Sequence, residues 1–143
     1  MSLSVFLAEN ALPVENVKYA ASPRFVKDGK PVEWEIRCIT NEENDAIMKE
    51  CTRRAPAAPG KRKGAYLPET DFSAYNAKLA AACTVSPNLH DAALQDSYKA
   101  KGAEALLKAM LTPGEYSDYL VKVQEVCGFG QDFGGLVDEV KNS

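Results

Sequence analysis

The feature that most constrains the fold is a pair of apolar stripes separated by a helix-start signal. The first stripe has the i, i+3, i+4, i+7, i+8 spacing of one helix face and consists of Ala103, Leu106, Leu107, Met110 and Leu111. Thr112-Pro113-Gly114-Glu115 follows, with Thr as N-cap, Pro at the first helical position and Glu completing a capping box. The second stripe consists of Tyr116, Tyr119, Leu120, Val123 and Cys127. These stripes predict two consecutive amphipathic helices, the second ending at Gly128.

The same kind of signal predicts three helices upstream. Helix starts are expected at Thr40 with Glu43, at Thr70 or Asp71, and at Asn88 with Asp91. The apolar positions after these starts are Ala46, Ile47, Met48 and Cys51; then Phe72, Tyr75, Leu79 and Cys83; then Leu94 and Tyr98. The first of these helices is expected to fray by Ala55. A helical turn is expected after Ser2, ending before Pro13, and a last short helix over about 132–141.

A β-hairpin is predicted before these helices. Asp28-Gly29 lies between two segments rich in Val, Phe, Trp and Ile, which places strands near 17–27 and 32–39. In the second segment Val32, Trp34, Ile36 and Cys38 alternate with charged residues, so one face is buried. An isolated hairpin is marginal in water, so this face must cover helices or the surface of a partner.

The predicted fold class is therefore α+β, mostly α, with an N-terminal β-hairpin followed by a small helical bundle. A length of 143 residues fits a single domain over 1–143. We divide it into the hairpin and first helix over about 1–54, a basic loop over about 55–68 and a helical part over about 69–143. The apolar runs are too short for a membrane span, and the N-terminus lacks the pattern of a signal peptide. The four cysteines lack C-x-x-C spacing and are expected to be reduced and mostly buried.

Catalytic, cofactor and metal sites are not expected. His90 is the only histidine, and nothing marks the third group that a catalytic dyad with Cys83 would need. The glycine-rich stretch 128–135 has Phe133 where a phosphate loop needs Gly, and it follows a helix instead of a strand. Glu33 and Glu35 share one side of a strand that we expect to face solvent.

Two segments are candidates for partner binding. Five basic residues lie between Cys51 and Pro68 without an acid, namely Arg53, Arg54, Lys61, Arg62 and Lys63, whereas the rest of the chain has 12 basic and 20 acidic residues. This segment suits a docking loop for an acidic protein, a solvated loop or a nucleic-acid contact, although a pI of 5.2 argues against the last. The second candidate is the tail with Phe129, Phe133 and Leu136, which folds either onto a partner or onto its own bundle.

The sequence resembles the XkdN-like tail assembly chaperones of tailed bacteriophages and of defective prophages in Gram-positive bacteria. The resemblance spans almost the whole chain and rests on SLSVFLAEN at 2–10, VKYAASPRFVKDGKPVEWEIRCITNEEND at 17–45, YLPETDFSAYNAKLAAACTVSPNLHDAALQDSY at 66–98 and GAEALLKAMLTPGEYSDYLVKVQEV at 102–126. The stretch from about Ala55 to Gly64 looks least like the family.

The resemblance implies a non-enzymatic function in the bacterial host cytoplasm. Such proteins coat the tape measure protein during assembly, keep it soluble, help recruit tail tube protein and are absent from the finished particle. In related phages a programmed frameshift appends a second domain to a minority of copies. Self-association is compatible with this role. The alternatives are a nucleic-acid-binding accessory protein that uses residues 53–63, and a structural tail component.

Overall fold

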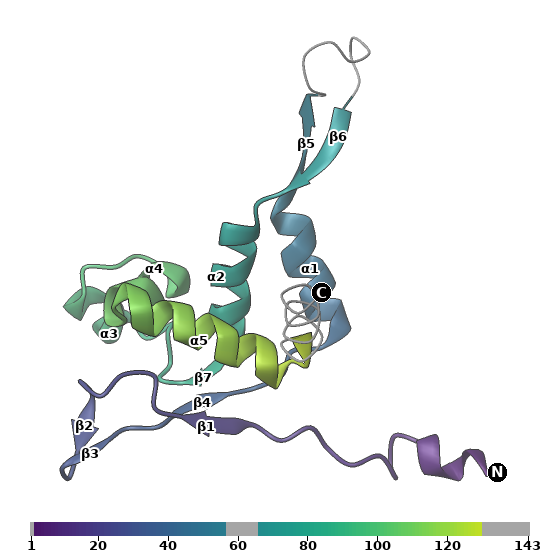
Figure 1. Ribbon diagram of the computed structural model, residues 1–143, viewed down its shortest axis with the longest axis horizontal. Helices are drawn as coiled ribbons and strands as arrows, with labels where there is room; N and C mark the ends of the chain where they lie inside the picture. The colour runs from purple at the N-terminus through teal and green to yellow at the C-terminus, as the bar shows by residue number, and fades with distance from the viewer. Residues whose placement is uncertain (1, 57–65, 130–143) are drawn as a thin grey trace, which may run out of the picture.

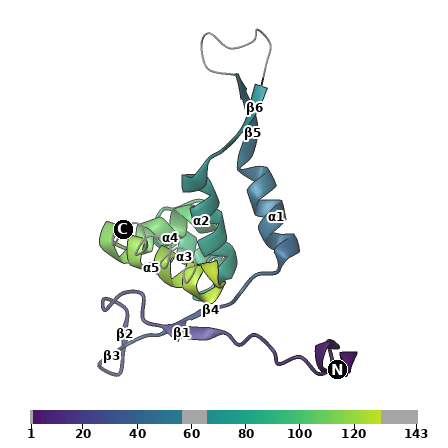
Figure 2. The same cartoon turned by 45° about the vertical axis from the view of Figure 1, so that its right-hand side comes forward.

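The computed structural model describes residues 2–56 and 66–129. A mixed body of short strands and helices carries two projections, an N-terminal arm and a two-stranded ribbon (Figures 1 and 2). The strands are β1 (Val17–Tyr19), β2 (Val26–Lys27), β3 (Lys30–Pro31), β4 (Trp34–Ile36), β5 (Thr52–Pro56), β6 (Tyr66–Thr70) and β7 (Thr84–Ser86). The helices are η1 (Leu3–Phe6), α1 (Asn41–Glu50), α2 (Phe72–Cys83), α3 (Ala92–Ser97), α4 (Ala103–Met110) and α5 (Pro113–Val126).

The predicted hairpin forms the centre of a small sheet. β1 pairs antiparallel with β4, with Val17 opposite Ile36 and Tyr19 opposite Trp34. A third strand, β7, is not predicted from the sequence and pairs with the other edge of β4. Trp34 and Ile36 are buried, whereas Glu35 between them points outward and forms an ion pair with Lys18 at 3.0 Å. The α+β fold class, with an N-terminal hairpin and a mostly helical remainder, is confirmed.

The strands of this hairpin are shorter than predicted. Asp28 and Gly29 both have positive φ angles, as expected for the tight turn of a hairpin. The continuous strands expected near 17–27 and 32–39 are wrong, because β1 ends at Tyr19 and pairing resumes at β2. In between, the chain leaves the sheet to contact α5, and the Ser22 hydroxyl donates to Glu115 Oε2 at 2.8 Å.

Three helix starts follow the predicted caps, whereas the start expected at Asn88 is wrong, because α3 begins only after Asp91. Thr40 and Thr112 form complete capping boxes with Glu43 and Glu115, and Asp71 and Asp91 accept from backbone N–H groups at the starts of α2 and α3. The predicted left-handed residue at Gly128 is confirmed by its φ of 86°. The short helix expected over 132–141 lies outside the described residues.

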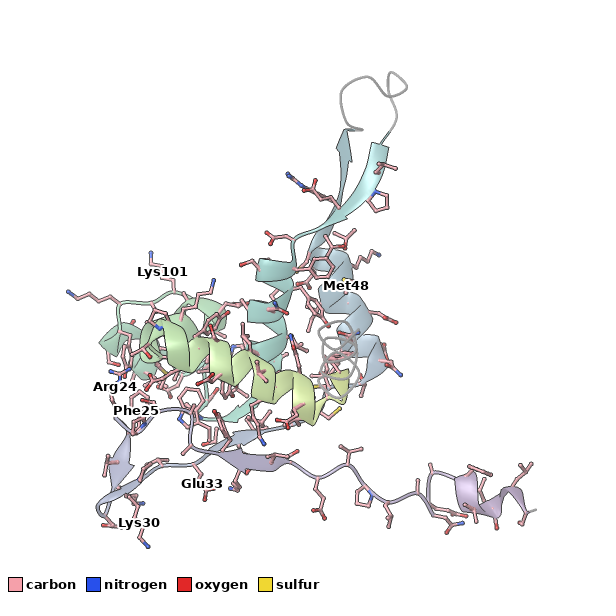
Figure 3. The ribbon with its side chains drawn as sticks, viewed as in Figure 1. Arg24, Phe25, Lys30, Glu33, Met48 and Lys101 are labelled. Atoms are coloured by element: carbon pink, nitrogen blue, oxygen red, sulfur yellow. The ribbon has the colours of Figure 1, made fainter. Side chains whose placement is uncertain are left out.

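The core lies where α2, α4 and α5 meet the inner face of the three-stranded sheet. Its most deeply buried large side chains are Trp34, Ile36, Leu79, Leu89, Leu106, Leu107, Tyr119 and Val123. The ring centroids of Trp34 and Tyr119 are 5.2 Å apart in an edge-on contact, and those of Phe25 and Trp34 are 6.2 Å apart. Phe25 is labelled beside the hairpin in Figure 3. These aromatic contacts connect the hairpin to the helices.

The loop expected over about 55–68 is wrong at both ends. α1 ends at Glu50 instead of fraying towards Ala55, and β5 and β6 then pair antiparallel from Thr52–Thr70 out to Pro56–Tyr66. The Thr52 and Thr70 hydroxyls share a hydrogen bond of 2.8 Å at the base of this ribbon. The ribbon is stabilised by cross-strand pairing. Its sequence is polar and contains prolines, so it has no pattern that predicts strands.

Two predicted properties of the whole chain are tested on the described part. Cys38, Cys51, Cys83 and Cys127 are free thiols; Cys51 and Cys83 are buried, and Cys38 and Cys127 are only half-buried. Within residues 2–56 and 66–129, no helix combines the length and apolarity that crossing a membrane requires.

Candidate protein-binding groove

An apolar groove of about 380 Å³ lies between α1, α2 and the end of α5. Its lining residues are Asn44 and Met48 from α1, Phe72, Tyr75, Asn76 and Leu79 from α2, Gln124 from α5, and Phe129. We call it the α1–α2–α5 groove. Met48 is labelled on the helix that forms one wall (Figure 3).

Local sequence signals determine where the walls of the groove stand. The β5–β6 ribbon connects α1 to α2, and its antiparallel pairing returns the chain to the point where it left α1. The Asp71 N–H donates to the Cys51 carbonyl at 2.8 Å, so the start of α2 is held at the end of α1. Gly128, with its left-handed backbone, ends α5 and brings Phe129 onto the core.

The floor of the groove is apolar and rich in flexible or aromatic side chains. Leu79 and Tyr75 are buried at the bottom, and Met48 and Phe129 are half-buried along the sides. Phe72 is 62% exposed at the mouth, and its ring lies edge-on to Tyr75 with centroids 6.5 Å apart. Methionine and aromatic surfaces adapt to differently shaped apolar partners.

The rim of the groove is polar but uncharged. The Tyr75 hydroxyl donates to Asn44 Oδ1, and Gln124 Nε2 donates to Asn76 Oδ1 at 3.5 Å. Burial raises the pKa of Tyr75, so this hydroxyl stays protonated at neutral pH. No lining residue of the groove carries a formal charge at that pH. The groove is therefore suited to apolar side chains from an uncharged face of a partner.

A charged bracket next to the groove holds α1 in place. Both terminal nitrogens of Arg37 donate to the Glu43 carboxylate, at 2.7 and 3.1 Å, and Arg37 Nε donates to the Ala82 carbonyl at 3.1 Å. Arg37, together with the Thr40 backbone N–H, lowers the pKa of Glu43 to about 2. One guanidinium thus joins the start of α1 to the end of α2.

Three thiols lie beneath the end of α5. The Cys83 and Cys127 sulfurs are 3.6 Å apart, and Cys38 lies on the chain segment between β4 and α1. This contact lowers the pKa of Cys127 and raises the pKa of Cys83, and either thiol can be the donor of the shared hydrogen bond.

The predicted partner-binding residues fall in different places. Phe129 lines the groove, whereas Phe133 and Leu136 lie outside the described residues. Arg53 and Arg54 are on β5, and Arg53 is exposed across the ribbon from Glu69. Lys61, Arg62 and Lys63 lie outside the described residues. Around Arg53 the surface has mixed charge, because Glu50, Glu69, Asp71 and Lys78 line the same hollow.

The residues weighed as catalytic candidates do not come together. His90 is exposed just before α3, and its backbone N–H donates to Asn88 Oδ1 at 3.0 Å. Cys83 instead contacts Cys127. Glu35 is held by Lys18 and by Asn16, which donates to it at 2.8 Å. Among the described residues, no group of three or more His, Cys, Asp or Glu side chains is arranged to bind a metal ion.

Sequence reasoning found Phe129 but assigned the other apolar residues of the groove to helix stripes. Met48 was expected on the first helix, and Phe72, Tyr75 and Leu79 on the buried face of the next. The position of Phe72 is a signal for the groove. Phe72 directly follows the Asp71 cap, and this large apolar side chain is exposed in the first turn of α2.

Comparison with known proteins identifies related sequences over almost the whole chain. The family described as "Phage XkdN-like tail assembly chaperone protein, TAC" matches residues 3–141. The uncharacterized protein YqbN of Bacillus subtilis (strain 168) is 32% identical over 143 residues, covering 98% of this chain and 93% of YqbN. The phage-like element PBSX protein XkdN of the same strain is 30% identical with the same coverage.

The fold is also similar to a solved structure. The crystal structure of the protein YqbN matches with a TM-score of 0.75 and 28% identity, covering 90% of this chain and 98% of that chain.

Proposed function

The chain belongs to the family of phage XkdN-like tail assembly chaperone proteins, and from this premise we propose that it binds the tape measure protein, keeps it soluble and helps recruit tail tube protein. It acts as a binding protein, in the host cytoplasm, and is absent from the finished particle. Family membership supports a role in tail assembly and contacts with tail proteins; the specific clients are our proposal.

The observation that carries the proposal is the α1–α2–α5 groove. A tape measure protein is expected to be long, helical and apolar along one face, so that it aggregates unless that face is covered. The groove presents Met48, Phe72 and Phe129 beside an uncharged rim, which suits one apolar face of a client helix.

The strength of each contact must be modest, because the client has to be released when tube subunits polymerise. A Kd near 1 µM corresponds to about 8 kcal/mol. Several chaperone copies bound along one client chain supply enough combined affinity without making any single contact irreversible.

Two further contacts belong to the proposal. Phe133 and Leu136, which follow Phe129 outside the described residues, extend the apolar client contact. Arg53, Arg54, Lys61, Arg62 and Lys63 supply a basic contact for an acidic protein surface, with Arg53 exposed on the ribbon. Phage clients with different acidic patches would then be distinguished by the ribbon and held by the groove.

Co-expression with the neighbouring tape measure gene tests the proposal. The wild-type chain should raise the soluble yield of that protein and co-elute with it. Phe72→Ser should weaken the complex by about tenfold, since burying one aromatic side chain contributes about 1.5–3 kcal/mol. Val121→Ser is the matched control, because Val121 is 61% exposed on α5 and does not line the groove.

Three results would contradict the proposal. If the soluble yield of the tape measure protein is unchanged and no complex elutes, the client assignment fails. If mass spectrometry of purified particles finds the chain in stoichiometric amounts, it is a structural tail component instead. Equal loss of binding in Phe72→Ser and Val121→Ser would place the client outside the groove.

A further inference from the structure

The N-terminal arm, residues 2–16, leaves a large apolar surface uncovered. It runs away from the body in both ribbon views (Figures 1 and 2). Six of its apolar residues are exposed: Leu3 by 78%, Val5 by 66%, Phe6 by 68%, Leu7 by 48%, Leu12 by 91% and Val14 by 73%. Scattered apolar residues on a surface need no explanation, but six within twelve positions indicate an interaction site.

The arm has local structure that holds these side chains in place. The Ser2 hydroxyl accepts from the Ser4 N–H at 3.2 Å and caps η1. Asn10 Nδ2 donates to the Ser4 carbonyl at 2.7 Å, and the Asn10 N–H donates to the Leu7 carbonyl at 2.9 Å. These bonds close the segment on itself, so part of the ordering cost of binding is already met.

A second apolar hollow lies at the root of the arm. It has a volume of about 450 Å³; Val14, Cys38, Ile39, Cys127 and Phe129 form its apolar lining, and Thr40, Asn41 and Asn44 form a polar, uncharged side. We call it the root cavity. Asn16 Nδ2 donates to Glu35 Oε2 at 2.8 Å and fixes the point where the arm leaves the sheet. Each copy of the chain therefore carries an apolar arm and, next to the base of that arm, the root cavity. The arm extends away from this cavity.

We propose that two copies of this chain exchange their N-terminal arms, with the segment Leu3–Leu7 of each seated in the root cavity of the other. A twofold pair requires a self-complementary surface, in which each partner gives and receives the same element. Antiparallel arms that cross about midway along their length, near Asn10, satisfy this condition, because Leu3–Leu7 of each arm then reaches the base of the other next to Val14.

The exposed area agrees with this occupant. Together the six apolar residues expose on the order of 800 Å², close to the roughly 800 Å² that each partner contributes to a standard protein interface. Each partner of an exchanged pair therefore supplies, through its own arm, about the area that a standard interface requires of it.

The charges agree as well. Residues 2–8 of the arm carry no charged side chain, and the residues that line the root cavity are also uncharged. Glu9 and Glu15 flank the apolar segments and remain in solvent. An uncharged segment meeting an uncharged cavity avoids the cost of burying an unpaired charge.

Sedimentation equilibrium of the full-length chain alone, over about 1 to 100 µM, tests the exchange. The wild-type chain should be a dimer, and Leu3→Ser/Phe6→Ser should raise the dimer dissociation constant by at least about tenfold without changing the helical circular dichroism. The control Val26→Ser/Val121→Ser changes two valines with exposures of 56% and 61% outside the arm, and should dimerise like the wild type. A monomeric wild type, or an arm variant that dimerises normally, would overturn the proposal.

Photo-cross-linking identifies the occupant directly. A benzoylphenylalanine at position 6, in a mixture of ¹⁴N- and ¹⁵N-labelled chains, should cross-link to the peptide that contains Ile39 and Asn41 of the other isotope. Cross-links confined to one chain would mean that the arm folds back on its own body, and cross-links confined to an added tail protein would mean that it binds a client. Either result overturns the exchange. Because the sedimentation measurement uses the chain without clients, its outcome is separate from that of the Phe72→Ser test.

Discussion

The core and the N-terminal arm use the same kinds of side chain with opposite results. Trp34, Ile36 and Tyr119 are at most 2% exposed, whereas Leu3, Phe6 and Leu12 are at least 68% exposed. Local structure does not explain the difference, since both regions have satisfied caps or strand pairs. The core side chains stabilise the fold, whereas the arm side chains are not covered by any other part of the described chain. Apolar residues therefore indicate function here only where the fold leaves them uncovered.

The largest effect on stability is expected at the aromatic contact between sheet and helices. Trp34→Ala removes a side chain that contacts both Phe25 and Tyr119, and the loss should lower the free energy of unfolding by about 3–5 kcal/mol. Urea denaturation followed by circular dichroism measures it. A loss below about 1 kcal/mol would mean that the sheet packs on the helices mainly through other contacts.

A smaller loss is expected when one buried hydroxyl is removed from the same core. The Tyr119 hydroxyl shares a hydrogen bond of 2.6 Å with Thr84 on β7, and Thr84 keeps a second bond to the Ala80 carbonyl. Tyr119→Phe should therefore lower the free energy of unfolding by about 1 kcal/mol. The control is Thr84→Val in the Tyr119→Phe background. If the loss of stability in this double variant equals the sum of the two single losses, the two hydroxyls act independently.

Acid should weaken the bracket that holds α1. The pKa of Glu43 is about 2 in the folded chain, below its ordinary value of 4.5, because Arg37 and the Thr40 N–H stabilise the carboxylate. The stabilisation is therefore complete above about pH 5 and is lost as the pH falls towards 2. The Arg37 and Glu43 side chains are 35% and 39% exposed, so screening by solvent should limit the stabilisation from this ion pair to roughly 0.5–1 kcal/mol.

Glu43→Gln tests this pH dependence. The variant should show a shallower fall in urea stability between pH 5 and pH 2 than the wild type, while Glu42→Gln, one position away in the first turn of α1, should behave like the wild type. Parallel pH profiles for all three proteins would mean that the Arg37 contact does not contribute to stability in solution.

The helices could be predicted because their signals are local. The Thr40 and Thr112 boxes, the Asp71 cap and Gly128 act within four residues, and all four lie where the sequence placed them. The apolar stripe over 103–111 likewise depends on spacing alone, and its inner residues are buried in α4.

The strands missed by sequence reasoning depend on partners far along the chain. β7 has three residues, Thr84 to Ser86, and pairs with Glu35 and Ile36, almost fifty positions away. β5 and β6 contain Pro56 and Pro68 and lack apolar alternation. In both cases the strand exists because another strand lies beside it, and single-segment patterns carry no such information.

The candidate site was predictable in part for the same reason. Phe129 stood out beyond the regular stripe, next to a helix-ending glycine. Met48 and Phe72 become one surface only when the β5–β6 ribbon returns the chain and places α1 against α2. The packing of α1 against α2 is a tertiary property. The sequence therefore predicts the helices that carry these residues, but it does not predict the groove that they form together.

The smallest effect on stability is expected in the arm, and it tests the opening contrast most directly. Leu12 is 91% exposed, so Leu12→Ser removes a side chain that contributes little to the core, and the free energy of unfolding of the monomer should change by less than about 0.5 kcal/mol. Urea denaturation at low protein concentration isolates this term from dimerisation. Leu106→Ser, at a fully buried position of α4, is the matched control and should unfold the chain. If the arm variant lost more than about 1 kcal/mol under these conditions, Leu12 would belong to the stabilising part of the molecule, and its exposure would no longer indicate a docking surface.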